Sequence, residues 1–431
     1  MLFDLPPIVA LLPLVIYVIL AFKDVDPLLS VIISVILSAI ITKQPLIEIG
    51  SVLSEALGSF LAMIGFIIML GAALGEILRK TGVAEYIVIT FMKRIGINSE
   101  RKAIVAVMIT SCVLVALLGT LAGANAIIAP IVIPLVASIG ITPSTLAAVF
   151  QGAGQTGLFI GPYSPQVVTL MEVTGISYGA YLAGIGLPLA ILCWIVTFIV
   201  SQRIQKNTRN IYVYNDVEEI DENYIPTNEV KRATLVFFIS LIALVVYGII
   251  NECGSSYAIV VMFITAFLTG IAGKLKLKDI IDTIVKGASK MTSLFIMFVL
   301  FYPFITFIQE AGAFDALVDL FQPLIRTGNK VLFALVVTIT GVFGVGGAAV
   351  AETVLLNDLF SQIVSKLGMS PSLWGLILLV ASQITSFAYP EADMLGQMGI
   401  ARSNDLKNMV KFGIAITIAS IVLVFIRALI G

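Results

Sequence analysis

The stretch "QTGLFIGPYSPQ", residues 155–166, interrupts an otherwise apolar chain with glycines, prolines and hydroxyl groups. Proline lacks an amide donor and glycine tolerates unusual dihedral angles, so a helix is expected to stop and restart within "IGPYSP". In hydrocarbon, irregular backbone survives only where it lines a cavity or is buried in protein. The stretch therefore predicts a broken membrane helix and half of a binding site. The alternative is a proline kink that only eases packing.

The composition around this stretch is that of a polytopic helical membrane protein. Of 431 residues, 59% are hydrophobic and 12% are charged, and the mean hydropathy is +1.09. Apolar runs at 7–22, 180–200 and 413–430 are each long enough to cross about 30 Å of hydrocarbon. The first run has no basic flank and no small-residue cleavage site, so we expect a spanning helix that stays in the mature chain.

Several kinds of chemistry are excluded or disfavoured by the residue counts. The chain has no histidine, which removes histidine-based proton relays, catalytic triads and metal sites. Its cysteines, Cys112, Cys193 and Cys253, show no paired spacing that would indicate disulfides or a metal site. The net charge of −1 gives no indication of a nucleic-acid partner, and we expect none. The remaining chemistry belongs to carboxylates, amides, hydroxyls and backbone.

The second half of the chain repeats the first. With a constant offset of 228 positions, residues 119–146 align with 347–374, and residues 154–162 align with 382–390. The aligned pairs include identical glycines and prolines: Gly119/Gly347, Gly140/Gly368, Pro143/Pro371 and Pro162/Pro390. The alternative is chance similarity between two hydrophobic sequences. Matched glycines and prolines are, however, harder to obtain by chance than matched leucines.

We therefore predict an all-α polytopic membrane protein made of two inverted repeats of five transmembrane helices. Each repeat is expected to hold a re-entrant hairpin and a broken helix. The expected parts are a first repeat over 1–200, a cytoplasmic linker loop over 201–232 and a second repeat over 233–431. In the first repeat we expect these elements: spanning helices at 7–22, 27–42, 58–78 and 177–200, interfacial helices at 45–57 and 83–97, a hairpin of 103–118 and 126–140, and a broken helix at 142–175. Five crossings is an odd number, so the second repeat would be inverted.

This layout makes a prediction about basic residues. It places 20 of the 25 Lys and Arg residues on one face and the remaining 5 on the other. Cytoplasmic loops are enriched in Lys and Arg. The protein is therefore expected to be a multi-pass protein of the inner cell membrane, with the central loop in the cytoplasm and both termini outside.

Polar residues gather at the breaks and at the hairpin tips, where the ends of broken helices offer N–H groups to anions. Amides and hydroxyls at these positions suit the recognition of a carboxylate or a hydroxyl group. The expected substrate-binding residues are Thr120, Gly123, Asn125, Gln155, Thr156, Gly161, Tyr163, Ser164, Thr353, Thr385 and Ser386, with Gln151 in the same polar set.

Four carboxylates, Glu352, Asp358, Glu391 and Asp393, occupy the second tip and break regions. A carboxylate at the centre of a membrane helix costs about 2.5–3.5 kcal/mol, so a function is favoured over idle placement. We expect these groups to couple transport to a cation, either by holding Na⁺ or by carrying a proton. Na⁺ is the only metal expected, and no other cofactor is. Asp358 and Asp393 could instead cap a helix or face water.

The run at 57–96, with the hairpin and broken helix that follow it, resembles the gluconate permease family of the wider ion-transporter superfamily. The resemblance covers most of the chain in layout, and the sequence similarity is clear in the first half. It implies an elevator-like carrier, often a homodimer, that takes up small organic anions with protons or sodium. Family members typically have a histidine and a Pro-Pro-x-Pro-Gly-like run at the first break. Here the run is "IGPYSP" and histidine is absent, so the family's substrate does not transfer directly.

Three functions are compatible with these features. The first is a secondary active transporter that couples H⁺ or Na⁺ to the symport of a small organic anion, a sugar acid or carboxylate. No Lys or Arg falls within the breaks or tips, so the anion would rely on helix ends, amides and a co-bound cation. The second, a Na⁺/H⁺ antiporter or a carrier of a cationic solute, uses the acidic half more directly. The third, an intramembrane enzyme, needs a close carboxylate pair such as Glu391 and Asp393 but lacks any nucleophile motif. A passive channel would also fit, because sequence does not reveal coupling.

Overall fold

The computed structural model describes residues 6–23, 25–95, 98–214, 225–251, 253–320, 322–344 and 349–430. Within these ranges the secondary structure is entirely helical, which confirms the predicted all-α class. The elements of the first half are η2 (Pro7–Leu11), α1 (Leu12–Phe22), α2 (Pro27–Thr42), α3 (Leu46–Ala56), α4 (Phe60–Lys80), α5 (Val83–Ile95), α6 (Glu100–Leu118), α7 (Leu121–Ala137), α8 (Pro143–Ile160), α9 (Pro165–Thr174), α10 (Tyr178–Tyr181), η3 (Leu182–Gly186) and α11 (Leu187–Thr208).

The second half follows a similar order. Its helices are α12 (Asn228–Ile250), α13 (Tyr257–Ala272), α14 (Leu277–Ser289), α15 (Thr292–Glu310), α16 (Ala313–Leu320), α17 (Gln322–Thr327), α18 (Lys330–Val342), α19 (Ala349–Lys366), α20 (Pro371–Gln383), α21 (Thr385–Ala388), α22 (Ala392–Ile400) and α23 (Leu406–Ile430). Among the described residues, six helical segments are long and apolar enough to cross a membrane: α4, α6, Tyr178–Thr208, α12, α15 and α23. The prediction of a polytopic membrane protein is thereby confirmed.

Local sequence explains where the helices begin and end. Pro27 opens α2, where its missing amide hydrogen costs nothing, and the Asp26 side chain accepts from Leu29 N at 2.9 Å. Ser59 caps α4 in the same way by accepting from Ala62 N at 3.2 Å. These signals lie close together in the chain, which is why the sequence predicts these helices within a few residues.

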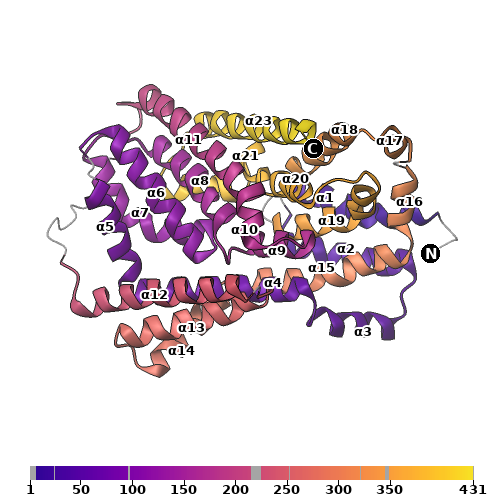
Figure 1. The fold of residues 1–431 in the computed structure, drawn as a ribbon, viewed down its shortest axis with the longest axis horizontal. Coiled ribbons are helices and arrows are strands. Elements are labelled where there is room, and N and C mark those ends of the chain that lie inside the picture. Colours follow the sequence, from indigo (N-terminus) through magenta and orange to yellow (C-terminus); the bar gives the residue numbers. More distant parts are fainter. Residues whose placement is uncertain are drawn as a thin grey trace.

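The two halves pack against each other through corresponding helices. Helices α4 and α15 are in contact, α13 and α14 pack on α4, and α2 and α3 pack on α15. In the remaining part, α8 packs against α6 and α11, while α20 packs against α18 and α23. Figure 1 shows α4, α12, α13, α14 and α15 along one side of the molecule, with α11 and α23 on the opposite side. The pairings agree with the two-half layout, and the inversion of one half relative to the membrane stays a prediction.

The first hairpin has a much shorter tip than the sequence suggests. The predicted second arm begins at residue 126, but α7 already begins at Leu121. Gly119 ends α6 in the left-handed conformation at φ 64°, and Thr120 caps α7 by accepting from Gly123 N at 3.4 Å. The stretch "LAGAN" is therefore helical. The corresponding second tip, residues 345–348, lies outside the described residues.

Helices α3 and α5, both predicted at the membrane interface, differ in their surroundings. In α3 the apolar side chains Leu46 and Ile47 are 87% and 90% exposed, as an interfacial helix requires. In α5 the apolar face is buried, including Val83, Ile87 and Val88, and packs against α6, α7 and α12. The apolar face of α5 is thus covered by protein, which an amphipathic pattern does not distinguish from a lipid interface, and its position relative to the membrane stays a prediction.

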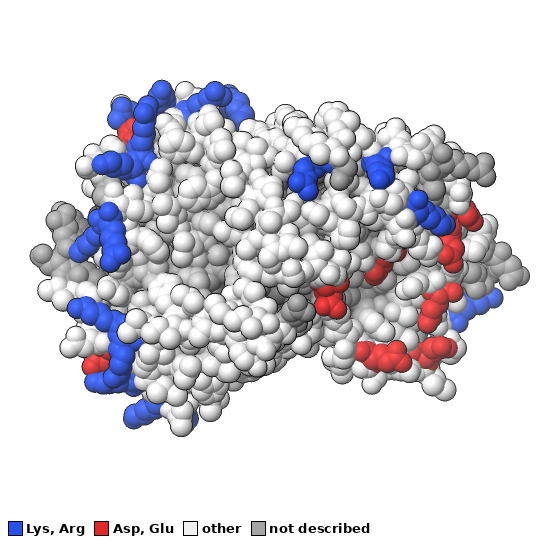
Figure 2. Space-filling model, viewed as in Figure 1, with Lys and Arg blue, Asp and Glu red and all other residues white. Residues whose placement is uncertain are grey.

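Charged side chains gather at the two ends of the molecule. Figure 2 shows Lys and Arg concentrated at the end that holds α5 and α14 in Figure 1, and Asp and Glu concentrated towards the opposite end. The surface between them is largely uncharged in this view. We refer to the Lys- and Arg-rich end as the basic end.

Close helix packing in the first half depends on glycine. A Cβ atom at Gly157 of α8 would lie 2.4 Å from Cys112 O and 2.8 Å from Ala116 N, both in the backbone of α6. We expect Gly157→Ala to destabilise the fold by about 1–3 kcal/mol, because α6 and α8 would have to separate. The matched control is Gly50→Ala in α3, where nothing lies within 4 Å of the added Cβ. Thermal unfolding of the purified variants checks this, and an unchanged melting temperature for Gly157→Ala would contradict the packing.

Candidate functional site

Two helices break at the prolines that the sequence singles out. Helix α8 ends at Ile160, and α9 restarts at Pro165. In the second half, α20 and the short α21 lead to an extended residue, Tyr389, and α22 restarts at Ala392. Among the described residues, the restarted helix α9 has no side-chain cap at its first turn, whereas the Glu391 side chain caps the first turn of α22. At the first break Gly161, Ser164 and Pro165 are buried, whereas Pro390 and Ala392 of the second break are exposed.

Each restarted helix binds the hairpin of the other half. From α22, Gln397 Oε1 accepts from Asn125 Nδ2 of α7 at 2.7 Å. From α9, Gln166 Nε2 donates to Thr353 Oγ1 of α19 at 2.8 Å and to Ser382 Oγ at 3.0 Å. Asn125 and Thr353 occupy matched positions at the offset of 228. The two halves are thus joined by reciprocal, fully buried polar contacts.

Between the breaks lies a buried amide cluster, formed by Gln151, Gln155 and Ser386. Gln151 Nε2 donates to the Ser386 carbonyl at 3.0 Å, and Gln155 Nε2 donates to Ser386 Oγ at 2.7 Å. Both glutamines are 0% exposed and lie one helical turn apart on α8. The Oε1 atom of each has no hydrogen-bond partner among the described residues. Buried polar atoms are normally paired, so two unpaired oxygens from successive turns of one helix indicate a place for a donor or a cation.

Two of the four predicted carboxylates are buried. Glu391 caps α22 by accepting from Asp393 N at 3.0 Å through Oε1, while its Oε2 has no partner among the described residues. Glu352 lies in the first turn of α19, and a Cβ added at Gly344 would meet its Oε1 at 2.0 Å. Its Oε2 is likewise unpaired, and both side chains are 8% exposed.

The other two carboxylates are half-buried: Asp393 lies in the first turn of α22, and Asp358 further along α19. Among the described residues, no three His, Cys, Asp or Glu side chains group closely enough to hold a metal ion. A sodium site here would therefore depend on amide, hydroxyl or carbonyl oxygens in addition to a carboxylate.

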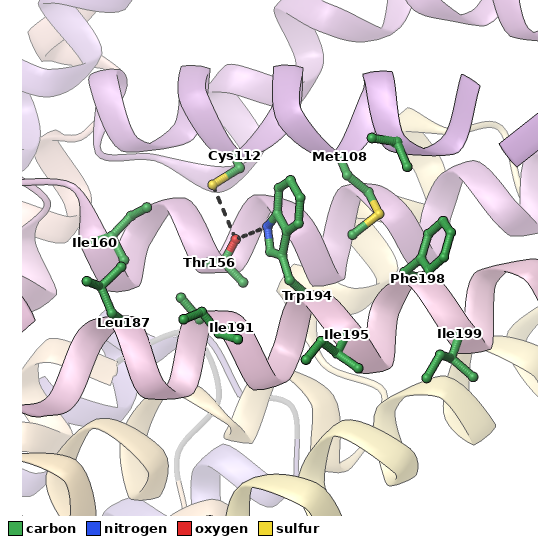
Figure 3. Close-up of a pocket in the computed structure, with 12 residues that line it drawn as sticks. Met108, Cys112, Thr156, Ile160, Leu187, Ile191, Trp194, Ile195, Phe198 and Ile199 are labelled. Atoms are coloured by element: carbon green, nitrogen blue, oxygen red, sulfur yellow. Dashed lines mark hydrogen bonds between the residues drawn. The ribbon is translucent and has the colours of Figure 1, made fainter. Parts of the chain in front are cut away.

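Several predicted site residues lie elsewhere. Thr156 points away from the amide cluster and accepts from Trp194 Nε1 at 2.9 Å (Figure 3). Gly161 packs on α6, where an added Cβ would lie 2.6 Å from Ala116 O, and Tyr163 lies near Gly248 of α12. Ser164 Oγ donates to Leu158 O at 2.5 Å. These four residues shape the first break without joining the cluster.

The threonines among the remaining predicted residues form hydrogen bonds with backbone groups of the helices. Thr120 and Gly123 form the cap of α7, and Thr385 Oγ1 donates to Ala381 O at 3.2 Å or Gly341 O at 3.3 Å. The structure thus brings together Gln155 and Ser386 across the breaks, and places Asn125 and Thr353 at the contacts between the halves.

Sequence reasoning missed Gln166 and Gln397. Both are amides on the short helices that follow the breaks, and both are at most 1% exposed. Other polar residues on the same helices, Glu172 on α9 and Asp393 on α22, gave the sequence no way to single these amides out. Ser382, which bonds to Gln166, and Ser111, which bonds to Asn125, are less conspicuous because Ser in helices also bonds to the backbone of its own helix.

Asn125 has a structural role in addition to any contact with a substrate. Its Oδ1 accepts from Ser111 Oγ at 2.7 Å, and its Nδ2 donates to Phe150 O and Gln397 Oε1, so both amide hydrogens are used. We expect Asn125→Ala to destabilise the fold by about 1–3 kcal/mol for each buried partner left unpaired. The control is Asn251→Ala, an exposed side chain that bonds only to Tyr247 O within α12. Equal melting temperatures of the two variants would contradict this role.

An all-helical chain with apolar spans and two broken helices that meet in its interior is the build of a membrane transporter. The family model of the GntP family permease matches residues 5–257, which is more than half of the chain. The chain therefore belongs to the GntP permease family, and the resemblance to gluconate permeases is confirmed.

Two solved transporter structures share the fold. MtrF of Neisseria gonorrhoeae, described within "a class of antimetabolite efflux pumps", has a TM-score of 0.61 at 12% identity, covering 88% of this chain and 84% of MtrF. The YdaH transporter of Alcanivorax borkumensis, described as having "an unusual topology", has a TM-score of 0.63 at 13% identity, covering 89% of this chain and 88% of YdaH. At this identity the likeness concerns the fold alone. No curated protein sequence matches the chain.

Proposed function

We propose that this chain is a secondary active transporter that carries a small organic anion, a sugar acid or carboxylate, in symport with H⁺ or Na⁺. The observation that carries the proposal is the buried amide cluster between the two breaks, with unpaired oxygens on Gln151 and Gln155. These oxygens can accept from the hydroxyl groups of a sugar acid or coordinate Na⁺. The first turn of α9, which no described side chain caps, offers N–H groups to a carboxylate.

The position of Glu391 supports coupling to a cation. Its buried Oε2 lies at the start of α22, in the same break region that would receive the substrate. An anionic substrate beside an ionised carboxylate would be repelled in a low-dielectric interior. A proton on Glu391, or a Na⁺ held between Glu391 and neighbouring oxygens, removes that repulsion. Anion binding would then require the cation, which is the condition for symport.

The helix arrangement supports an elevator-like movement. Helices α8 and α20 carry the breaks and pack on α11, α18 and α23, whereas α4, α13, α14 and α15 form a separate packed group. We propose that the first group moves against the second. We further propose a homodimer in the inner membrane, as the family resemblance implies, with the basic end in the cytoplasm and both termini outside.

The proposal is tested by thermal unfolding of the purified protein with sugar acids, dicarboxylates, hydroxy acids and basic amino acids, each with sodium or potassium and at two pH values. A ligand at 100 times its Kd stabilises the folded state by about 2.7 kcal/mol. We expect one class of anion to raise the melting temperature, and only with sodium or at the lower pH.

A second candidate function, Na⁺/H⁺ antiport or transport of a cationic solute, is favoured by the two buried carboxylates with unpaired oxygens, Glu352 and Glu391. It makes the opposite prediction in the same assay. A melting temperature raised by sodium or a basic amino acid, and unchanged by every anion, would overturn the symport proposal and establish this alternative.

A further inference from the structure

A surface groove runs between α6 and α11, with α8 as its floor (Figure 3). We call it the α6–α11 groove. Its volume is about 550 Å³, and most of its lining is aliphatic or aromatic: Val105, Met108, Ile160, Ile191, Ile195 and Phe198. The groove lies on the side of α8 that faces away from the amide cluster, because Thr156 lines it while Gln155 does not.

The few polar atoms in the groove already satisfy one another. Trp194 Nε1 donates to Thr156 Oγ1 at 2.9 Å, and Thr156 Oγ1 lies 3.3 Å from Cys112 Sγ and 2.6 Å from Ala153 O. Figure 3 shows these side chains in a row across the middle of the groove. A polar ligand would find no free partner there, so the occupant must be apolar.

The groove opens on the outer face of α11. Leu187, Ile191, Ile195 and Ile199 recur every four residues and are 41–56% exposed. Both α6 and α11 belong to segments long and apolar enough to cross a membrane. In a bilayer, such a surface is covered by acyl chains unless protein covers it.

The groove leads to exposed basic side chains. Its two walls are antiparallel, with Met108 near Phe198 at one end and Ile160 near Leu187 at the other (Figure 3). Arg203 continues the α11 stripe one turn beyond Ile199, and Arg101 precedes Val105 by one turn of α6. Both arginines are exposed, and among the described residues neither is in an ion pair.

The acidic side chain at this end is already paired. Glu100 Oε1 binds Arg209 Nη2 at 2.5 Å and also accepts from Gln205 Nε2 at 3.2 Å. Lys102 adds a further exposed cation beside Arg101. An apolar groove that ends at unpaired basic groups has the shape and charge of a phospholipid site, with an anionic headgroup at the basic end.

We propose that the α6–α11 groove binds an acyl chain of an anionic membrane phospholipid, whose headgroup lies against Arg101 and Arg203. Each basic side chain near the membrane surface favours an anionic headgroup roughly five-fold. The bound chain would pack on Thr156 and Ile160, in the last turns of α8 before its break. The lipid would therefore pack against α8, the helix that carries Gln151 and Gln155. The proposal that the groove binds lipid does not depend on the proposed transport function.

Trp194 provides a direct probe because it lines the groove, whereas the only other tryptophan, Trp374, is 3% exposed. The full chain with Trp374→Phe is placed in vesicles of equal parts phosphatidylglycerol and phosphatidylcholine. Bromine atoms are carried on the acyl chains of one lipid or the other, so the surface charge is the same in both samples. We expect brominated phosphatidylglycerol to quench Trp194 fluorescence more strongly than brominated phosphatidylcholine.

The double variant Arg101→Gln/Arg203→Gln should equalise the two quenching levels. The control Lys278→Gln/Lys286→Gln removes the same number of charges from exposed positions of α14, across the molecule at the same end, and should leave the preference intact. Ala190→Phe, which fills the groove, should lower quenching by both lipids. The unsubstituted chain should show the same preference, and Trp194→Phe should remove it.

Equal quenching by the two lipids in the starting protein would overturn the proposal. So would a preference that survives the double arginine variant. Absence of quenching by either lipid would mean that protein, such as a second copy of the chain, covers the groove, and would also overturn it.

Discussion

Gln155→Leu is expected to reduce substrate transport by about 10- to 100-fold while leaving the fold intact. The change removes the Gln155 Oε1 that the proposal places in the binding site, and a buried donor left without its partner costs about 1–3 kcal/mol. The fold should tolerate it, because Ser386 Oγ still donates to Gln383 O and the substitution also removes an unpaired buried oxygen. Initial rates of uptake into proteoliposomes, alongside melting temperatures, measure both effects.

The control for Gln155→Leu is Gln362→Leu, the same substitution at an exposed position of α19. It removes only a contact of 3.3 Å with Asp315 and should transport at the wild-type rate. A wild-type rate for Gln155→Leu would place the substrate site away from the amide cluster. A large fall in its melting temperature would instead give Gln155 a structural role.

Glu391→Gln is expected to separate substrate binding from cation coupling. Glutamine has the shape of a protonated glutamate, and its Oε1 can still accept from Asp393 N, so the cap of α22 remains. The variant should bind the anion at either pH and without sodium, because the repulsive charge is gone. It should fail to accumulate the anion against a gradient. Binding is followed by thermal shift and accumulation by proteoliposome uptake.

The matched control is Glu172→Gln, which removes a charge from an exposed position of α9 that bonds to Ser255. It should keep both the cation requirement and accumulation. If Glu391→Gln still required sodium or low pH for binding and still accumulated substrate, coupling would belong to another group, with Glu352 as the next candidate.

Local signals explain how much of the fold could be predicted. The positions of α2, α4, α8 and α9 follow from proline, glycine and capping residues within a few positions of each boundary. The length of the first hairpin tip was misjudged because "LAGAN" contains a glycine, while the cap formed by Thr120 extends the helix through it. The burial of α5 depends on α6, α7 and α12, and periodicity alone does not reveal which partner covers an apolar face.

The site was predictable in its position but not in its contacts. Prolines at 162 and 390 locate the breaks, and the polarity of Gln155 and Ser386 places them nearby. Their contact joins residues 231 positions apart, so it depends on how the halves dock. The same holds for Asn125 with Gln397, which are 272 positions apart. Thr156, adjacent to Gln155, faces a different side of α8, because successive residues of an α-helix are about 100° apart around its axis.

Gradient-driven accumulation tests the central claim most directly. The purified chain is reconstituted into proteoliposomes, and uptake of the anion identified by thermal shift is followed with an inward sodium gradient, an inward proton gradient or neither. We predict transient accumulation above the external concentration with one gradient, abolished by an ionophore that dissipates it. Equilibration of the anion to the same level under all three conditions would contradict coupled symport and indicate a passive pathway.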